Sequence, residues 1–116
     1  MSFNEKFQSL GEFYKIDSPG EVRDFLRDNQ GIFVLLDEVK PYLIESFQDE
    51  KYNLEMVYDP ECEDCTHLVL RIYVLPERFH NGVHMDIEHV REKLRPLRRE
   101  YHVLSEFAVS AGVRYV

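Results

Sequence analysis

The clearest pattern of apolar and polar residues lies between Tyr52 and Leu75. Every second residue is apolar in two runs, which are Tyr52, Leu54, Met56 and Tyr58, then Leu68, Leu70, Ile72 and Val74. A period of two places such side chains on one face of a β-strand. Pro60 ends the first run, because proline cannot donate a hydrogen bond to a strand ladder. The pattern predicts a hairpin of strands 52–59 and 67–75, joined by an acidic tip.

The first residues of the chain carry only a weak pattern, and residues 18–21 then carry a strong signal for the start of a helix. Residues 1–11 are compatible with a short helix or a loose end, and 12–16 with a short strand. Ser18 is followed by proline and, three residues later, by Glu21, which is the pattern of a capping box. A helix is therefore predicted from this point to about residues 29–31.

A second helix is predicted from Ile32 to Phe47. Apolar residues recur in it at spacings of three and four, as on the buried stripe of an amphipathic helix. Pro41 lies inside the segment and removes one backbone donor. Because the apolar stripe continues beyond the proline, a kink near Lys40 is expected.

The segment after the hairpin is predicted to contain a loop, a long helix and a short strand. Residues 76–85 carry turn signals. Asp86 has the character of an N-cap, and apolar residues then recur at helical spacing to about residue 104, interrupted by Pro96. Ala111 and Gly112 suggest a turn before a last strand, 113–116.

These elements follow the order (β)-α-α-β-β-α-β, which is typical of an α+β fold. The last helix forms a crossover between the second hairpin strand and the last strand, so these two strands run in the same direction. We expect the last strand to lie beside the first hairpin strand. The prediction is a small antiparallel sheet of order 3-1-2, made of the hairpin and the C-terminal strand, with helices packed on one face.

Length and composition favour one globular domain over residues 1–116. Hydrophobic residues make up 44 % of the 116 residues, which is sufficient for one core. No apolar run approaches the roughly 20 residues that a membrane span needs, and the first residues lack a signal-peptide pattern. We therefore expect a cytoplasmic protein that does not bind membranes.

Negative charge is concentrated in one segment. The chain has a formal net charge of −8. Residues 45–64 hold one lysine and eight acids, a local sum of −7. Three of these acids, Glu61, Glu63 and Asp64, belong to the predicted hairpin tip. Because nucleic-acid phosphates are bound by clustered positive charge, this balance argues against nucleic acid and favours a basic protein partner.

Positive charge is clustered on the last predicted helix. Arg91, Arg95 and Arg98 recur at helical spacing and form one stripe. Such a stripe can bind an acidic partner or a phosphate backbone. The alternative is a solvated face that pairs with neighbouring glutamates.

Cys62 and Cys65 form the sharpest local motif, with His67 two residues further along. Two thiolates at this spacing provide half of a tetrahedral zinc site. The sequence has no second CxxC, and a predicted turn separates His80 from His84. The acidic surroundings also disfavour a reactive thiolate. We therefore expect a reduced, exposed pair and no metal or other cofactor.

The chain lacks the common catalytic signatures GxGxxG, GxxxxGK[ST], GxSxG and HExxH. Its layout of SPGEVRDFL, an acidic and apolar helix, YNLEMVYDPE, HLVLRIYVLPE and a closing helix and strand resembles small bacterial proteins of the same α+β plan. The resemblance covers residues 17–116 and implies a similar hairpin and a final helix ending in paired aromatics. This chain departs from it in the CxxC tip, in the loop 76–86 and at Tyr101. The resemblance implies no functional residues.

These features predict a non-catalytic protein that acts through protein–protein interaction or self-association as a possible homodimer. Aromatic residues, which are enriched in interface cores, make up 13 % of the chain. The candidate partner-binding residues are Glu61, Glu63, Asp64, Arg91, Arg95 and Arg98. One alternative is an antitoxin- or immunity-like neutraliser of a basic nuclease, which would bind through residues 45–64. A second alternative is a small metal-dependent enzyme built on Cys62, Cys65 and a histidine.

Overall fold

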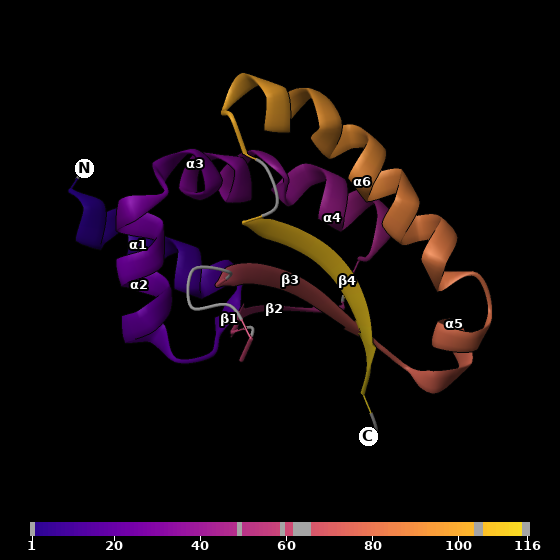
Figure 1. Cartoon of the computed structure of the whole chain (residues 1–116). Coiled ribbons are helices and arrows are strands. Elements are labelled where there is room, and N and C mark those ends of the chain that lie inside the picture. Colours follow the sequence, from indigo (N-terminus) through magenta and orange to yellow (C-terminus); the bar gives the residue numbers. More distant parts are fainter. Residues whose placement is uncertain (1, 49, 59, 62–65, 104–105, 115–116) are drawn as a thin grey trace.

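The computed structural model describes residues 2–48, 50–58, 60–61, 66–103 and 106–114. Its helices and strands are, in chain order, α1 (Phe3–Phe13), β1 (Lys15–Ile16), α2 (Pro19–Asp28), α3 (Gln30–Glu38), α4 (Lys40–Ser46), β2 (Lys51–Val57), β3 (His67–Val74), α5 (Pro76–His80), α6 (Val83–Glu100) and β4 (Phe107–Val113) (Figure 1). Helices pack against one mixed sheet, which confirms the predicted α+β class.

The strands form one sheet in the order β1-β2-β3-β4. β2 and β3 are the two arms of the predicted hairpin and pair antiparallel, with Leu54 opposite Leu70. β4 runs parallel to β3, with Val109 opposite Leu70. The hairpin prediction is therefore confirmed, and so is the common direction of the strands that the last helix connects.

The predicted strand order and the antiparallel character of the sheet are wrong. The last strand lies beside the second hairpin strand instead of the first, and the sheet is mixed. The reason is that β1 already occupies the other side of β2. It pairs with β2 in parallel and continues into a hydrogen bond of 3.0 Å from the Asp17 N–H to the Leu54 carbonyl. β4 therefore pairs with the other side of the hairpin, which is formed by β3.

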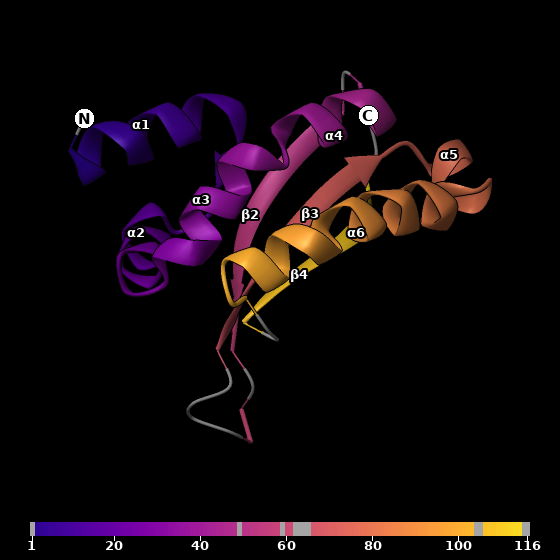
Figure 2. The same cartoon turned by 90° about the horizontal axis from the view of Figure 1, so that it is seen from above.

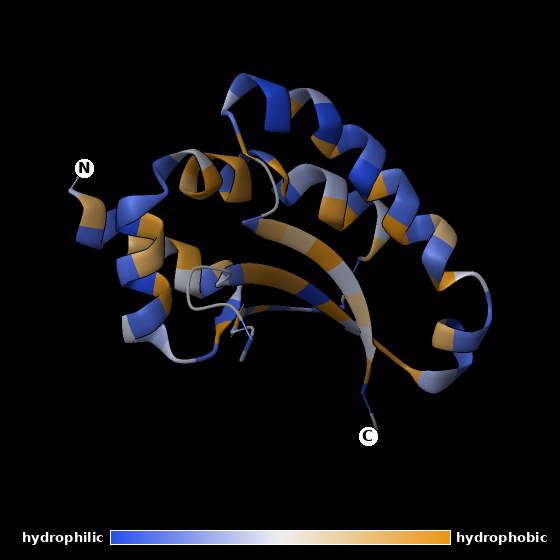
Figure 3. Ribbon diagram, in the orientation of Figure 1, coloured by the Kyte–Doolittle hydropathy of each residue, from blue (hydrophilic) through white to orange (hydrophobic). Residues whose placement is uncertain are grey.

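The core lies between the sheet and helices α3, α4 and α6, which are seen above the sheet in Figure 1. Seen from above, α6 crosses over β4 (Figure 2). Apolar positions of α6 and of β3 and β4 face each other (Figure 3). The strand residues that point into this core are almost fully buried: Leu54, Leu68, Leu70, Ile72, Val74, Phe107 and Val109.

The capping box predicted at Ser18 does not form. α2 starts at Pro19 as expected, but the Ser18 side chain makes no cap hydrogen bond. Its backbone has a φ of 50°, in the left-handed region, where its carbonyl instead accepts from the N–H groups of Glu21 and Val22 at 3.0 and 3.1 Å. The backbone of Ser18 thus replaces its side chain as the acceptor at this helix start.

The helix predicted from 32 to 47 is divided into α3 and α4, with Val39 between them. Pro41 has no N–H for the carbonyl of Asp37, so the helical ladder is interrupted where a kink was expected. Val39 nevertheless keeps an αR backbone, and its carbonyl accepts from the Leu43 N–H at 3.1 Å. The apolar stripe therefore continues across the break into the buried Phe47.

The segment predicted as a loop contains α5, and α6 begins at Val83, earlier than expected. Gly82 precedes α6 with a φ of 88°, a left-handed conformation that glycine adopts without steric cost. Asp86 consequently lies in the first turn of α6 and is not its N-cap. The helix continues through Pro96.

The turn predicted at Ala111 and Gly112 is also wrong, because both residues lie inside β4. Gly112 is opposite Tyr73 in the parallel register. A Cβ at Gly112 would lie 2.7 Å from Cε1 of the Tyr73 ring. The glycine therefore provides space for an aromatic ring in a sheet and does not mark a turn.

Candidate protein-interaction surfaces

The sheet face that points away from the core carries a hydrogen-bonded triad. The hydroxyl of Tyr73 donates to Oε2 of Glu55 at 2.6 Å, and Nη1 of Arg71 donates to Oε1 of the same carboxylate at 3.1 Å. The hydrogen bond to Glu55 raises the pKa of Tyr73, because it stabilises the protonated phenol. Asn53, opposite Arg71, is also on this face and is buried. The triad makes a polar surface of tyrosine, arginine and carboxylate, here called the open face.

β4 is an edge strand, and no other described strand pairs with its outer side. Toward β3, the Leu68 N–H donates to the Glu106 carbonyl at 2.7 Å, and the Arg114 N–H donates to the Val74 carbonyl at 2.9 Å. Backbone groups alternate between the two sides of a strand. The residues that direct their N–H and C=O groups outward are therefore Phe107, Val109, Ala111 and Val113.

Two of the three arginines predicted to bind a partner contact this edge. Arg91 donates from Nε and Nη2 to the carbonyl oxygen of Val109, at 3.2 and 2.6 Å. The guanidinium of Arg98 lies 5.4 Å from the centre of the Phe107 ring. Arg95 is exposed between them on α6. The basic stripe that the sequence predicted thus runs along the edge of β4.

The positive charges along this edge repel one another. The pKa of Arg98 is lowered, first by burial of its guanidinium and then by the nearby charge of Arg91, while Glu106 acts in the opposite direction. Arg91 also forms an ion pair with Glu88, with 2.5 Å between Nη1 and Oε1. Two carboxylates therefore offset part of the basic charge that three arginines bring to β4.

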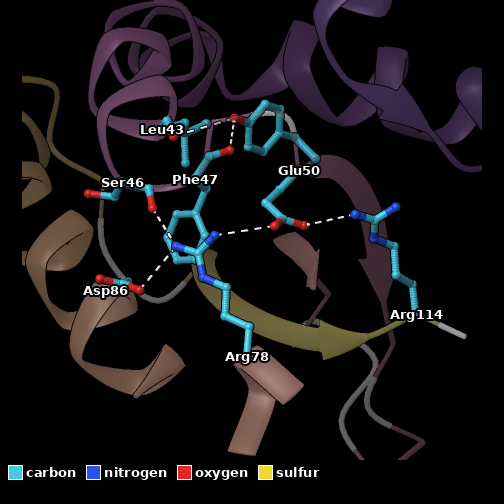
Figure 4. Close-up of polar contacts among 8 residues, drawn as sticks. Leu43, Ser46, Phe47, Glu50, Arg78, Asp86 and Arg114 are labelled. Atoms are coloured by element: carbon cyan, nitrogen blue, oxygen red, sulfur yellow. Dashed lines mark hydrogen bonds and ion pairs between the residues drawn. The ribbon is translucent and has the colours of Figure 1, made fainter. Parts of the chain in front are cut away.

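A second polar cluster lies at the end of the sheet and was not predicted from the sequence. Arg78, on α5, donates to the carbonyl of Ser46 at 2.6 Å, to Asp86 at 3.1 Å and to Glu50 at 3.2 Å (Figure 4). Its guanidinium lies 4.7 Å from the centre of the Phe47 ring. Turn signals around Arg78 predict a loop, so no helical spacing in the sequence indicates this residue as part of a site. The cluster connects α4, α5 and α6.

The described acids of residues 45–64 do not form one surface. The other oxygen of Glu50 accepts from Arg114 at 3.3 Å, so this carboxylate is shared by two arginines at the sheet end (Figure 4). Glu55 belongs to the open face and is bound to Arg71. Of the predicted tip residues, Glu61 is exposed. The described acids of this segment thus belong to separate sites, two of which contain arginine.

Most of the hairpin tip lies outside the described residues, namely Cys62, Glu63, Asp64 and Cys65. His67 is described as the first residue of β3 and is half-buried. In the described part of the chain, no group of three or more histidines, cysteines and acids is placed to hold a metal ion. The proposed roles of the tip in metal binding and in partner binding therefore remain sequence-based predictions.

Two surface grooves flank α1. The smaller has a volume of about 350 Å³ and is lined by Lys6, Phe33, Asp37 and Lys40 among others. Lys40 pairs with Asp37 at 2.9 Å and lies 5.4 Å from the centre of the Phe13 ring. The larger groove, of about 550 Å³, borders Lys15 and Arg23. Two of the charged groups that line the smaller groove, Asp37 and Lys40, thus pair with each other.

Comparisons of the chain with protein-family models, with curated proteins and with solved structures each find no match. None of the described helices has the length and apolar character that crossing a membrane requires.

Proposed function

We propose that this chain is a non-catalytic cytoplasmic protein that binds a partner protein by strand addition at the free edge of β4. The observation that supports this best is the composition of the edge. β4 is seven residues long, with the sequence FAVSAGV. Exposed edges are normally protected by proline, lysine, bulges or very short strands, because their unpaired backbone groups are templates for another strand. β4 has neither proline nor lysine, so it suits recognition through the backbone.

The open face supports the same proposal. Parallel strands are normally covered on both faces, whereas the described helices cover β3 and β4 on the face opposite Arg71 and Tyr73. Tyrosine and arginine are also enriched at the centres of protein interfaces. A partner that adds a strand to β4 would extend the sheet and place its own side chains beside this face.

The two alternatives receive less support. A neutraliser of a basic nuclease would use residues 45–64 as one acidic surface, but Glu50 is bound by Arg78 and Arg114, and Glu55 is bound by Arg71. The metal-dependent enzyme would depend on Cys62 and Cys65, which lie outside the described residues. We therefore rank both below an interaction protein.

Affinity purification from the native host tests the proposal with two variants of one residue. Ala111→Pro removes an outward N–H and leaves the pairs with β3 in place. Ala111→Ser keeps the N–H and serves as the control. A partner protein should be recovered with the wild type and with Ala111→Ser, and it should be lost with Ala111→Pro.

Thermal unfolding checks that each variant is folded before the comparison. Ala108→Pro provides a further control, because the N–H of Ala108 points toward β3 and its loss should weaken the ladder. Recovery of the same partner with a folded Ala111→Pro variant would show that the edge of β4 is not the binding site.

A further inference from the structure

Arg91 occupies a position that an added strand would need. The Val109 carbonyl is one of the outward groups of β4, and it accepts two hydrogen bonds from the Arg91 guanidinium. A strand that pairs along the whole edge would donate its own N–H to this oxygen. Arg91 would then lose the two hydrogen bonds from Nε and Nη2 and keep its ion pair with Glu88 through Nη1, and donors of a charged group that lose their acceptor are costly where they are partly buried.

The positions of the other arginines restrict which strand can compensate this loss. Arg95 and Arg98 lie on the same side of α6 as Arg91, because spacings of three, four and seven residues place side chains on one helix face. Arg98 is held against Phe107 in β4 itself. A strand added to β4 would therefore pass beneath a row of guanidinium groups belonging to a chain whose net charge is −8.

A carboxylate is the group that best replaces the Val109 carbonyl as the acceptor of Arg91. Its two oxygens match the fork of a guanidinium, and hydrogen bonds between charged partners are stronger than those to a neutral carbonyl. We propose, on the basis of strand addition at β4, that the added segment is an extended acidic stretch of the partner protein. Its carboxylates take the Arg91 guanidinium from Val109 and bind Arg95 and Arg98 along the edge.

A second copy of this chain that pairs through its own β4 does not meet these requirements. β4 contains no aspartate or glutamate between Phe107 and Val113, so another β4 strand cannot supply the carboxylate. Antiparallel pairing of two β4 edges would also bring two Arg91 guanidinium groups onto the same edge, where their charges repel. The edge is therefore complementary to an acidic strand and not to itself.

Fluorescence anisotropy with labelled peptides of the length of β4 tests the inference directly. The first peptide alternates threonine and glutamate, and two matched peptides carry glutamine or lysine in place of glutamate. The glutamate peptide should bind the wild-type chain, and the glutamine peptide should bind at least about tenfold more weakly, since each charge-assisted hydrogen bond contributes that much. The lysine peptide should not bind.

Variants of the chain test whether the glutamate peptide binds at the edge of β4 and whether Arg91 causes the preference for glutamate. Ala111→Pro should abolish binding of the glutamate peptide, and Ala111→Ser should preserve it. Arg91→Gln should reduce the preference for glutamate over glutamine, because the Val109 carbonyl is then free and the guanidinium is absent. Amide chemical shifts of β4 residues should change when the glutamate peptide is added and remain unchanged with the lysine peptide.

Four results would overturn the inference. Equal affinity for the glutamate and glutamine peptides would remove the role of the carboxylate. Tighter binding of a single-stranded oligonucleotide that is lost in Arg95→Gln would assign the arginines to phosphate. A dimer in light scattering that Ala111→Pro converts to a monomer would show that a second copy occupies the edge. Loss of a native partner with Ala111→Pro, without any binding of the glutamate peptide, would leave the proposed function standing and refute its acidic partner.

Discussion

At the residue scale, the space around two helical glycines differs sharply. An added Cβ at Gly31, in the first turn of α3, would lie 2.6 Å from the backbone oxygen of Tyr101. At Gly20, in the first turn of α2, no atom lies within 4 Å of such a Cβ. The absence of a side chain at Gly31 thus allows the end of α6 to approach α3, whereas Gly20 has no such role.

These surroundings predict opposite effects of the same substitution. Gly31→Ala should lower the free energy of unfolding by about 1–3 kcal/mol, because the backbone must shift to admit the methyl group. Gly20→Ala should raise it by about 0.4–1 kcal/mol through the lower entropy of the unfolded chain. Urea denaturation followed by circular dichroism measures both. A Gly31→Ala variant as stable as Gly20→Ala would contradict the close approach of Tyr101.

A hydrogen bond controls the ionisation of Tyr101. Its hydroxyl donates to Oε1 of Glu38 at 2.7 Å, and this bond is the largest cause that raises its pKa to about 12. The folded state therefore holds the phenolic proton more tightly than the unfolded chain. The resulting stabilisation is complete below the unfolded pKa of about 10 and is lost as the pH rises toward 12.

The pKa of Tyr101 should fall toward its ordinary value of 10.0 in Glu38→Gln, because the carboxylate acceptor is removed. Titration of the tyrosine ring carbons by NMR measures this shift. Tyr73, which is bound to Glu55, serves as an internal control whose pKa should not change. An unchanged Tyr101 titration in Glu38→Gln would show that the hydrogen bond does not set the pKa.

At the scale of elements, two prolines occupy different places in their helices. Pro41 lies in the first turn of α4, where its missing N–H breaks no hydrogen bond within α4. Pro96 lies inside α6, where its missing N–H leaves the carbonyl of Glu92 without the usual helical partner. The first proline fits its helix start, and the second interrupts a helix that forms despite it.

The same replacement should therefore change stability in opposite directions. Pro41→Ala should destabilise the protein by up to about 1 kcal/mol, since it adds freedom to the unfolded chain, and a hydrogen bond to the Asp37 carbonyl would form only if the break between α3 and α4 closed. Pro96→Ala should stabilise it by about 1–3 kcal/mol, because alanine restores the hydrogen bond and the helix propensity. Chemical denaturation of both variants tests the pair. Destabilisation by Pro96→Ala would mean that the core is packed around a bend at this proline.

At the scale of the whole molecule, Arg78 connects segments that lie far apart in the chain. It binds the end of α4 through Ser46, the start of β2 through Glu50 and the first turn of α6 through Asp86. Its side chain is 31 % exposed and that of Glu50 is 13 % exposed. Because Glu50 also binds Arg114, the same carboxylate holds the carboxyl end of β4.

Arg78→Met should lower the free energy of unfolding by about 1–3 kcal/mol. The substitution leaves Glu50 poorly compensated in a largely buried position, although partial exposure reduces the effect below that of a fully buried ion pair. Arg95→Met is the matched control, and the exposed position of Arg95 predicts a change within about 0.5 kcal/mol. Equal stability of the two variants in thermal and urea unfolding would show that the sheet-end cluster does not stabilise the fold.

Local patterns in the sequence were sufficient to predict several helices and strands. The alternation from Leu68 to Val74 predicted β3, because a strand with one face in the core must place an apolar residue at every second position. The apolar stripes around Leu35 and Val90 predicted helices, because a helix with one face in the core places apolar residues at spacings of three and four. The helical spacing of Arg91, Arg95 and Arg98 likewise predicted that these residues lie on one side of α6.

The arrangement of these elements depends on contacts between distant segments of the chain. β4 pairs with β3 because the two residues of β1, Lys15 and Ile16, take the other side of the hairpin, and no local pattern states which edge of a hairpin stays free. Gly112 looked like part of a turn, since the ring of Tyr73 that requires its small size lies 39 positions away in the sequence. The contact of Arg91 with Val109 likewise joins a helix to a strand edge through space. Such contacts depend on the packing of distant segments, and for that reason the candidate binding edge became visible only in the folded chain.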